Sequence, residues 1–303
     1  VTEKSGNLNL GVPGIMYLGG FAGFASAWAY ENTAANPSGA VSVVIALTCA
    51  ILASMAGGLI YAFLTISLRA NQNVTGLALT TFGMGVANFF GVFILNGASY
   101  SAAPIANKAF SAKIPVLSTL GGFGQVVFSY GFLVYAAIAL AIALHWFLTR
   151  TRAGLNLRAV GENPATADAA GINVTLYKYL ATCIGAGICG IGGLYYVLDY
   201  NQGIWATTGQ IEALGWLAVA LVIFTTWKPL NAIWGAYLFG MLYWLYQFLP
   251  TLLGITMASH ITDLVQMLPY VVTIVVLIVV SMRKKKENQP PAHLGLAYFR
   301  EER

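Results

Sequence analysis

Residues 40–66 read AVSVVIALTCAILASMAGGLIYAFLTI, an apolar run without a single charged side chain. A helix of about 20 apolar residues is long enough to cross the hydrocarbon core of a bilayer. Lipid offers the backbone no hydrogen bonds, so a spanning segment must be a helix or part of a closed barrel. The run does not alternate apolar and polar residues, as a barrel strand would. It therefore predicts a membrane-spanning helix.

Seven further apolar runs extend this prediction along the chain. We expect an all-α fold, a polytopic membrane helix bundle with about eight transmembrane helices within one transmembrane domain, residues 1–282. Residues 283–303 form a basic tail. The sixth and seventh runs are short and separated by Lys228-Pro229, so they are either two tight spans or a partly re-entrant pair. The other predicted spans are 10–31, 76–98, 124–148, 175–198, 212–227, 231–250 and 263–282.

Small residues recur at four-residue spacing on two of these spans. Such stripes let helix backbones approach closely and favour association in lipid. They predict packing faces and carry no functional information. The stripes are Gly83, Ala87 and Gly91 on the third span, and Thr182, Ala186 and Gly190 on the fifth.

The composition excludes several classes of protein. The chain is 58% hydrophobic and 8% charged, whereas soluble domains have about 25% charged residues. The net charge of +5 would favour nucleic acid if the basic residues formed a stripe on a soluble domain. They lie instead at the ends of apolar runs, where anionic lipid attracts them. We therefore expect lipid and no nucleic acid as a partner. Cys49, Cys183 and Cys189 lie inside apolar runs with no metal-ligand spacing, so we expect no metal site.

The distribution of lysine and arginine predicts the orientation. With the amino terminus inside, 13 of the 15 basic residues fall on the inner side, and only Lys108 and Lys113 fall outside. We expect a multi-pass protein of the plasma or inner membrane, with loop 149–173 and the carboxyl tail in the cytoplasm. No apolar run precedes Glu3, so we expect no signal peptide. The first residue, Val1, indicates an unusual start codon or a missing upstream segment.

The longest inner loop contains the signals of a short helix. Asn163 suits the N-cap position and Pro164 the first helical position. Residues 165–170 propagate a helix well, and Gly171 supplies a left-handed C-cap. A helix of about two turns is too short to be stable alone in water. Spacing alone leaves two interpretations open, an ordinary capped connector or a helix that inserts into a groove of a partner.

Several motifs resemble the permease subunits of ABC importers, in particular the group that serves simple sugars and nucleosides. The tail, ENQPP at 287–291 with YFREER at 298–303, is similar to the nucleoside (guanosine-type) permeases. The resemblance covers nearly the whole chain. The other motifs that carry it are EKSGNLNLG at 3–11, GLNLRAVGENP at 154–164 with AGI at 170–172, and AVALVIF at 218–224 with WKP at 227–229.

This resemblance implies three protein partners: an ABC ATPase subunit, a second homologous permease subunit and an extracellular substrate-binding lipoprotein. It also implies that the short helix is a coupling helix, which transmits the motion of the ATPase to the spans. Arg158 and Glu162 could contact that partner or be ordinary solvated charges. The residues assigned to the coupling loop are Arg158, Gly161, Glu162, Asn163, Pro164, Ala165, Asp168, Ala170 and Gly171.

Two departures from the family pattern limit which properties of the family can be expected of this chain. Members usually have one more span before the Glu3-Lys-Ser-Gly6 motif. They also tend to have Gly-x-Glu-Gly after the position of Asn9, where this chain has Gly11-Val-Pro-Gly14. No role of that carboxylate can be transferred.

The chain lacks the residues that catalysis would require. It has no phosphate-binding loop of the Gly-x-x-x-x-Gly-Lys-Ser/Thr type, so ATP and magnesium would bind to the partner ATPase and no cofactor to this chain. It has no His-Glu-x-x-His, Gly-x-Ser-x-Gly or paired carboxylates, so we expect no enzyme. An ion-coupled carrier or channel is a distant alternative. Such proteins usually place ionisable residues at the bilayer centre despite a cost of about 3 kcal/mol each, and no acid or base falls squarely in the middle of a predicted span here.

A neutral nucleoside would need amides, hydroxyls and aromatic faces along its path. Asn88 lies in the middle of a span, where an interhelical hydrogen bond is the plainer explanation. Glu212 opens a span, where an acid commonly complements the helix dipole. We favour a nucleoside as the cargo, with a simple sugar such as ribose or galactose as the alternative. The candidate path residues are Asn7, Asn9, Asn88, Gln125, Ser129 and Glu212.

Overall fold

Helices make up nearly all of the chain that the computed structural model describes, namely residues 1–95, 101–113, 128–205, 209–253, 265, 267–283 and 289–299. The amino-terminal half contains η1 (Glu3–Ser5), α1 (Val12–Thr33), α2 (Gly39–Ala62), the π-helical turn η2 (Phe63–Ser67), α3 (Gln72–Leu95), β1 (Ser101–Ala102), α4 (Pro104–Phe110) and α6 (Phe132–Arg150). The carboxyl-terminal half contains α7 (Arg152–Glu162), α8 (Pro164–Ala169), α9 (Val174–Tyr195), the π-helical turn η3 (Tyr196–Tyr200), β2 (Ile204–Trp205), α10 (Gln210–Phe224), α11 (Pro229–Leu253) and α13 (Leu268–Arg283). The predicted helical fold class is confirmed in this coarse form.

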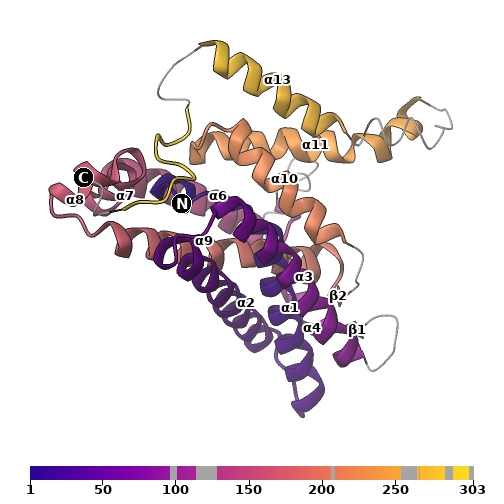
Figure 1. The fold of residues 1–303 in the computed structure, drawn as a ribbon. Helices are drawn as coiled ribbons and strands as arrows, with labels where there is room; N and C mark the ends of the chain where they lie inside the picture. Colours follow the sequence, from indigo (N-terminus) through magenta and orange to yellow (C-terminus); the bar gives the residue numbers. More distant parts are fainter. Residues whose placement is uncertain are drawn as a thin grey trace.

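The helix α1 lies at the centre of the bundle. It packs against α2, α3, α9 and α10, and α2 also packs along α9. The helices α10, α11 and α13 form a second group at one side (Figure 1). The main core includes residues of α1, α2, α4, α9 and η3. Its largest side chain is Trp205 of β2, which is 1% exposed and in ring contact with Tyr17, Phe21 and Phe24. The sequence did not single out this tryptophan.

Both predicted stripes of small residues are packing faces, as expected. A Cβ atom at Gly83 would lie 2.6 Å from the carbonyl carbon of Gly14, so α3 and α1 approach to backbone contact. A Cβ atom at Gly190 would lie 2.6 Å from that of Ser54, which joins α9 to α2 in the same way. Close backbone contact of this kind replaces the missing hydrophobic driving force between helices in lipid.

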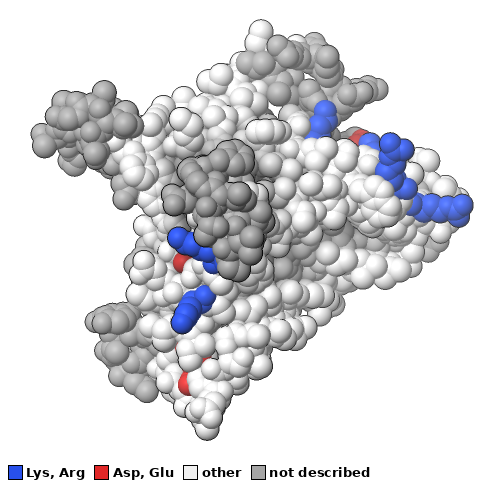
Figure 2. Space-filling model, turned by 180° about the vertical axis from the view of Figure 1, so that it is seen from behind, with Lys and Arg blue, Asp and Glu red and all other residues white. Residues whose placement is uncertain are grey.

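Four described helical segments are long and apolar enough to cross a membrane: Gly39–Ser67, Gln72–Ile94, Phe132–Arg150 and Val174–Tyr200. The helix α10 is apolar but spans only 15 residues, about 22 Å at 1.5 Å per residue. The count of eight spans therefore stays a prediction. The outer surface of the bundle is strongly apolar, with Leu52 66%, Met241 70% and Phe93 73% exposed. Figure 2 shows a wide face on which basic and acidic side chains are few.

The predicted elements differ from the structure in several places. The first helix begins at Val12 rather than residue 10, because the preceding residues turn at Gly6, which has φ +86°. Within the fourth predicted span the helix α6 begins at Phe132, after the non-helical residues 129–131. The sequence predicted neither α4 nor the antiparallel pair β1–β2, in which Ser101 is opposite Trp205.

Candidate functional site

The predicted short helix exists as α8, with the caps that its sequence indicated. The Oδ1 atom of Asn163 accepts a hydrogen bond from the amide of Thr166 at 3.0 Å, and Pro164 takes the first helical position. Gly171 adopts φ +82° beyond the carboxyl end. There the amide of Ile172 donates to the Ala167 carbonyl and that of Gly171 to the Asp168 carbonyl. This pair of bonds is a Schellman motif.

A second helix, α7, precedes α8 and was not predicted. The hydroxyl of Thr151 accepts a hydrogen bond from the amide of Gly154 and caps its amino end. The helix is amphipathic: Leu157 and Val160 are buried, while Arg158 is exposed. Leu157 packs against Leu148 at the end of α6. The signal was present in the sequence as an N-cap threonine followed by apolar residues three apart.

The residues before α1 (1–11), called the amino-terminal segment below, pack directly on α7. A Cβ atom at Gly161 would lie 3.0 Å from the carbonyl carbon of Lys4 and 3.2 Å from the amide nitrogen of Gly6, so only glycine fits there. The carboxylate of Glu3 accepts a hydrogen bond from the indole of Trp227, which lies in the turn between α10 and α11. Burial raises the pKa of Glu3, and the bond from Trp227 opposes that effect. The segment thus connects α7 to α10 and α11.

The carboxyl-terminal residues 289–299, called the strap below, lie across the same region. Both termini and the helices α7 and α8 are at one end of the molecule, called the terminal end (Figure 1). Two of the strap's bonds reach acidic side chains, Glu162 and Asp168, that the family resemblance assigns to the coupling loop. The strap donates from the His293 amide to the Gly161 carbonyl (3.0 Å), from the Gly295 amide to the Gly6 carbonyl (3.1 Å), from the Ala292 amide to Glu162 Oε2 (3.3 Å) and from the Tyr298 hydroxyl to Asp168 Oδ2 (2.9 Å).

The coupling-loop residues divide into an inner and an outer set. Gly161 and Pro164 are buried against the rest of the molecule, and Asp168 is half-buried under Tyr298. The others are exposed. The outer set is Arg158, Glu162, Asn163, Ala165, Ala170 and Gly171.

The candidate path residues do not come together. Asn7 is 1% exposed and its amide lies 3.4 Å from the Thr182 hydroxyl, while Asn9 accepts a hydrogen bond from the amide of Gly11 within its own turn. Both belong to the terminal end, because the amide of Leu8 donates to Gln72 at the start of α3. Asn88 lies sixteen residues beyond Gln72, which is about 24 Å along a helix axis.

The remaining candidates occupy other places. The buried Oδ1 atom of Asn88 has no hydrogen-bond partner among the described residues, so the interhelical bond offered as its plainer explanation is not made through that atom. Glu212 is half-buried in the first turn of α10. Ser129 is half-buried just before α6, and Gln125 lies outside the described residues.

The model of one protein family, described as the permease component of the branched-chain amino acid transport system, matches residues 1–279. The chain belongs to this family. The permease is also 31% identical over 278 residues to a nucleoside ABC transporter permease protein from Lactococcus lactis, covering 91% of this chain and 84% of the relative. No solved structure matches it significantly.

Two further relatives differ in their named substrates. A putative glucose ABC transporter permease protein from Haloferax volcanii is 35% identical over 247 residues, which cover 80% of this chain and 69% of the relative. A guanosine ABC transporter permease protein from Bacillus subtilis is 33% identical over 247 residues, covering 79% and 73%. The expected resemblance is thereby confirmed. The permease is a multi-pass membrane subunit of an ABC importer and not itself a catalytic chain, and such subunits work with ATPases and substrate-binding proteins.

Proposed function

We propose that this permease forms, with a second homologous permease, the path by which an ATP-driven importer takes nucleosides into the cell. In this proposal the residues 1–282 are the transmembrane domain, and ATP and magnesium bind only to the partner ATPase. The helix α8 docks on that ATPase and transmits its motion. The observation that carries the coupling role is the geometry of α8: a short, doubly capped helix with an exposed outer face, attached to the bundle through Gly161 and Pro164.

The orientation in this proposal follows the basic residues. The described lysines and arginines at the terminal end include Arg69, Arg152 and Arg158, whereas Lys108 belongs to α4 near the other end of α2. Basic residues concentrate on the cytoplasmic side of membrane proteins. The terminal end, with loop 149–173 and the carboxyl tail, is therefore the cytoplasmic side, and the substrate-binding lipoprotein delivers the cargo to the opposite side.

The contacts of α8 support its role as a transmitter. Its carboxyl end packs through Ala167 and Ile172 against Val160 of α7 and Val174 of α9. The helix α9 in turn packs along α1 and α2 at the centre of the bundle. A displacement of α8 would therefore reach the central helices through two buried contacts. Close-packed interiors transmit strain rather than absorb it.

The proposed cargo rests on the named substrates of the relatives together with the tail motif. Two relatives that align with most of this chain are named for nucleosides or guanosine. A sugar is the second candidate, because the Haloferax relative named for glucose is 35% identical. Both are neutral polar molecules that could use the same path.

A paired replacement tests the coupling role. Replacing Asn163-Pro164 with Gly-Gly removes the N-cap and the rigid first position of α8, and we expect it to abolish nucleoside uptake while membrane insertion persists. The chain offers a matched control in Asn36-Pro37, the same dipeptide in the turn between α1 and α2. The Gly-Gly replacement there should leave uptake near the original rate. Normal uptake by the Asn163-Pro164 variant would refute the coupling role.

Competition identifies the cargo. Cells with and without the gene are supplied with labelled guanosine, and uptake is measured in the presence of excess unlabelled nucleosides, ribose or glucose. We expect gene-dependent uptake that other nucleosides inhibit and sugars do not. Inhibition by sugar alone, or gene-dependent uptake of labelled sugar and not of guanosine, would favour the second candidate.

A further inference from the structure

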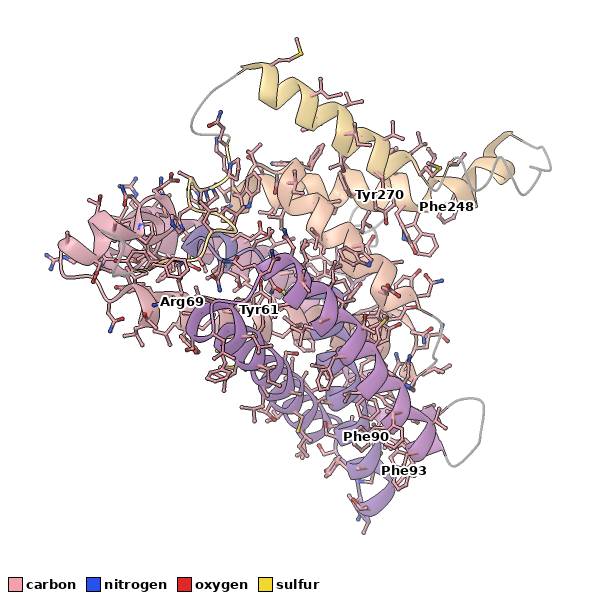
Figure 3. All side chains as sticks on the ribbon, viewed as in Figure 1. Tyr61, Arg69, Phe90, Phe93, Phe248 and Tyr270 are labelled. Atoms are coloured by element: carbon pink, nitrogen blue, oxygen red, sulfur yellow. The ribbon has the colours of Figure 1, made fainter. Side chains whose placement is uncertain are left out.

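A polar cavity of about 350 Å³ lies at the terminal end, where four parts of the chain meet. The turn after α2 contributes Arg69, and the start of α3 contributes Gln72. The strap closes one side through Tyr298. Figure 3 shows Arg69 and Tyr61 toward the end of the bundle that is opposite to Phe90 and Phe93. The remaining lining residues come from the amino-terminal segment, the turn after α2, and the stretch from the end of α8 into α9, and they include Asn7, Thr65, Asp168, Asn173, Thr175 and Lys178.

The burial of Lys178 in this cavity is not explained by its contacts with the described residues. This lysine is only 3% exposed, and it makes no ion pair or hydrogen bond with any described residue. It lies in the second turn of α9, close to the start of the helix. A buried charge without a partner costs several kcal/mol. The folded structure therefore places a costly positive charge where no described residue forms an ion pair or a hydrogen bond with it.

A second cation lies across the cavity. The guanidinium of Arg69 sits 4.6 Å from the centre of the Phe299 ring, so the strap holds it in place by a cation–π contact. Its backbone adopts φ +56°, which is uncommon for a residue other than glycine. Burial, followed by the nearby charge of Lys178, lowers the pKa of His293 in the strap. That histidine is therefore neutral at pH 7 and adds no third cation.

The first turn of α9 adds neutral donors to these two cations. The N-cap side chain of Asn173 accepts from the amide of Leu176, which leaves the amides of Val174 and Thr175 without an intrahelical partner. Both residues line the cavity. Free amides at a helix start bind anions well because the dipole and the N–H groups act together. The cavity thus combines two cations with oriented backbone donors.

One acidic side chain also lines the cavity. Asp168 projects from α8, and its Oδ2 atom accepts the hydrogen bond from Tyr298. Two cations against one carboxylate leave the lining with an excess of positive charge. A bound anion would offset this excess of positive charge, whereas a water molecule or a neutral solute would not.

We propose that this cavity is a binding site for a phosphate group, supplied either by a small phosphate or phosphate monoester or by the headgroup of a membrane phospholipid. Phosphate presents several acceptor oxygens in different directions, which suits donors from Lys178, Arg69 and the start of α9. The bound group would join α2, α8, α9 and the strap, so its occupancy would stiffen the region next to α8. The proposal is independent of the cargo.

The test measures binding to the full-length permease purified in a neutral detergent. Labelled inorganic phosphate is the first probe, and native mass spectrometry for co-purifying phospholipid is the second. We expect saturable binding of phosphate, or one tightly held phospholipid that phosphate displaces. Replacing Lys178 with Met should weaken this binding by roughly tenfold or more, because hydrogen bonds to charged groups are among the strongest. Lys178→Arg keeps the charge and should retain binding.

The matched control is Lys108→Met, the same chemical change at an exposed position of α4; it should bind as the original protein does. Thermal unfolding of each variant shows whether it is folded. If the Lys178→Met variant is unfolded, phosphate binding by the Lys178→Arg variant decides the test. Phosphate binding without lipid, or lipid without phosphate, would each support the site and identify its source. Binding of neither probe, or equal binding by the Lys178→Met and Lys108→Met variants, would overturn the proposal.

Discussion

At Gly161 the backbone of α7 comes so close to the amino-terminal segment that a side chain would not fit between them. The Cβ atom of an alanine would lie 3.0 Å from the carbonyl carbon of Lys4, and the neighbouring atoms belong to backbone that has little freedom to move. The carbonyl of the same residue accepts the amide of His293 from the strap. One glycine therefore permits the contact of three segments that are distant in sequence.

Replacing Gly161 with Ala should lower the stability of the folded permease. We expect a loss of about 1–3 kcal/mol, the usual cost of forcing extra atoms into a packed site, read as a lower midpoint of thermal unfolding. Gly85→Ala in α3 is the control, because no described atom lies within 4 Å of its added Cβ. That change should raise stability by up to about 1 kcal/mol through helix propensity. Equal midpoints for the two variants would show that the close approach at Gly161 is not needed.

The helix α8 shows what sequence alone can predict. Its determinants, Asn163, Pro164 and Gly171, all lie within or beside the helix, so local capping rules identified both of its ends. The long apolar runs likewise predicted the helices of the bundle. The helix α7 was missed because Gly154 and Asn156 interrupt its apolar pattern, and its stability comes from packing on Leu148 and on the amino-terminal segment.

The contacts of the strap could not be predicted, because their partners are 130 residues apart in sequence. No local pattern links Tyr298 to Asp168 or places the buried Lys178 beside Arg69. The same limit applies to the path residues: polarity selected Asn7 and Asn88 equally, and only the fold separates them by the length of a helix.

The bond between Tyr298 and Asp168 gives a prediction for α8 as an element. Tyr298→Phe removes one hydrogen bond of the strap while keeping the ring, and a bond of this kind contributes about 1 kcal/mol. We expect amide hydrogen exchange in residues 164–171 to accelerate by a factor of about five, the equivalent of that energy. Tyr237→Phe is the control, a 60% exposed position on α11. Unchanged exchange in α8 would show that the strap does not stabilise it.

For the molecule as a whole, the apolar outer surface and the distribution of charge both concern how the bundle lies in a membrane. The bundle presents side chains such as Leu52 and Phe93 on its outside, and lipid rather than water can cover them at no cost. The termini, α7 and α8 lie together at one end of this apolar bundle (Figure 1). Which side of the membrane this end faces decides whether α8 can meet an ATPase at all, since ATP is cytoplasmic.

Labelling of single cysteines determines the orientation. Cys49, Cys183 and Cys189 are free and half-buried, so they are first replaced with alanine to lower the background. Lys108→Cys on α4 and Arg152→Cys on α7 then provide two exposed sites at opposite ends of the bundle. Because basic residues favour the cytoplasmic side, we expect a membrane-impermeant maleimide to label residue 108 in intact cells. Residue 152 should react only after the membrane is permeabilised. Labelling of residue 152 in intact cells would place α8 outside, and the coupling role would then be impossible.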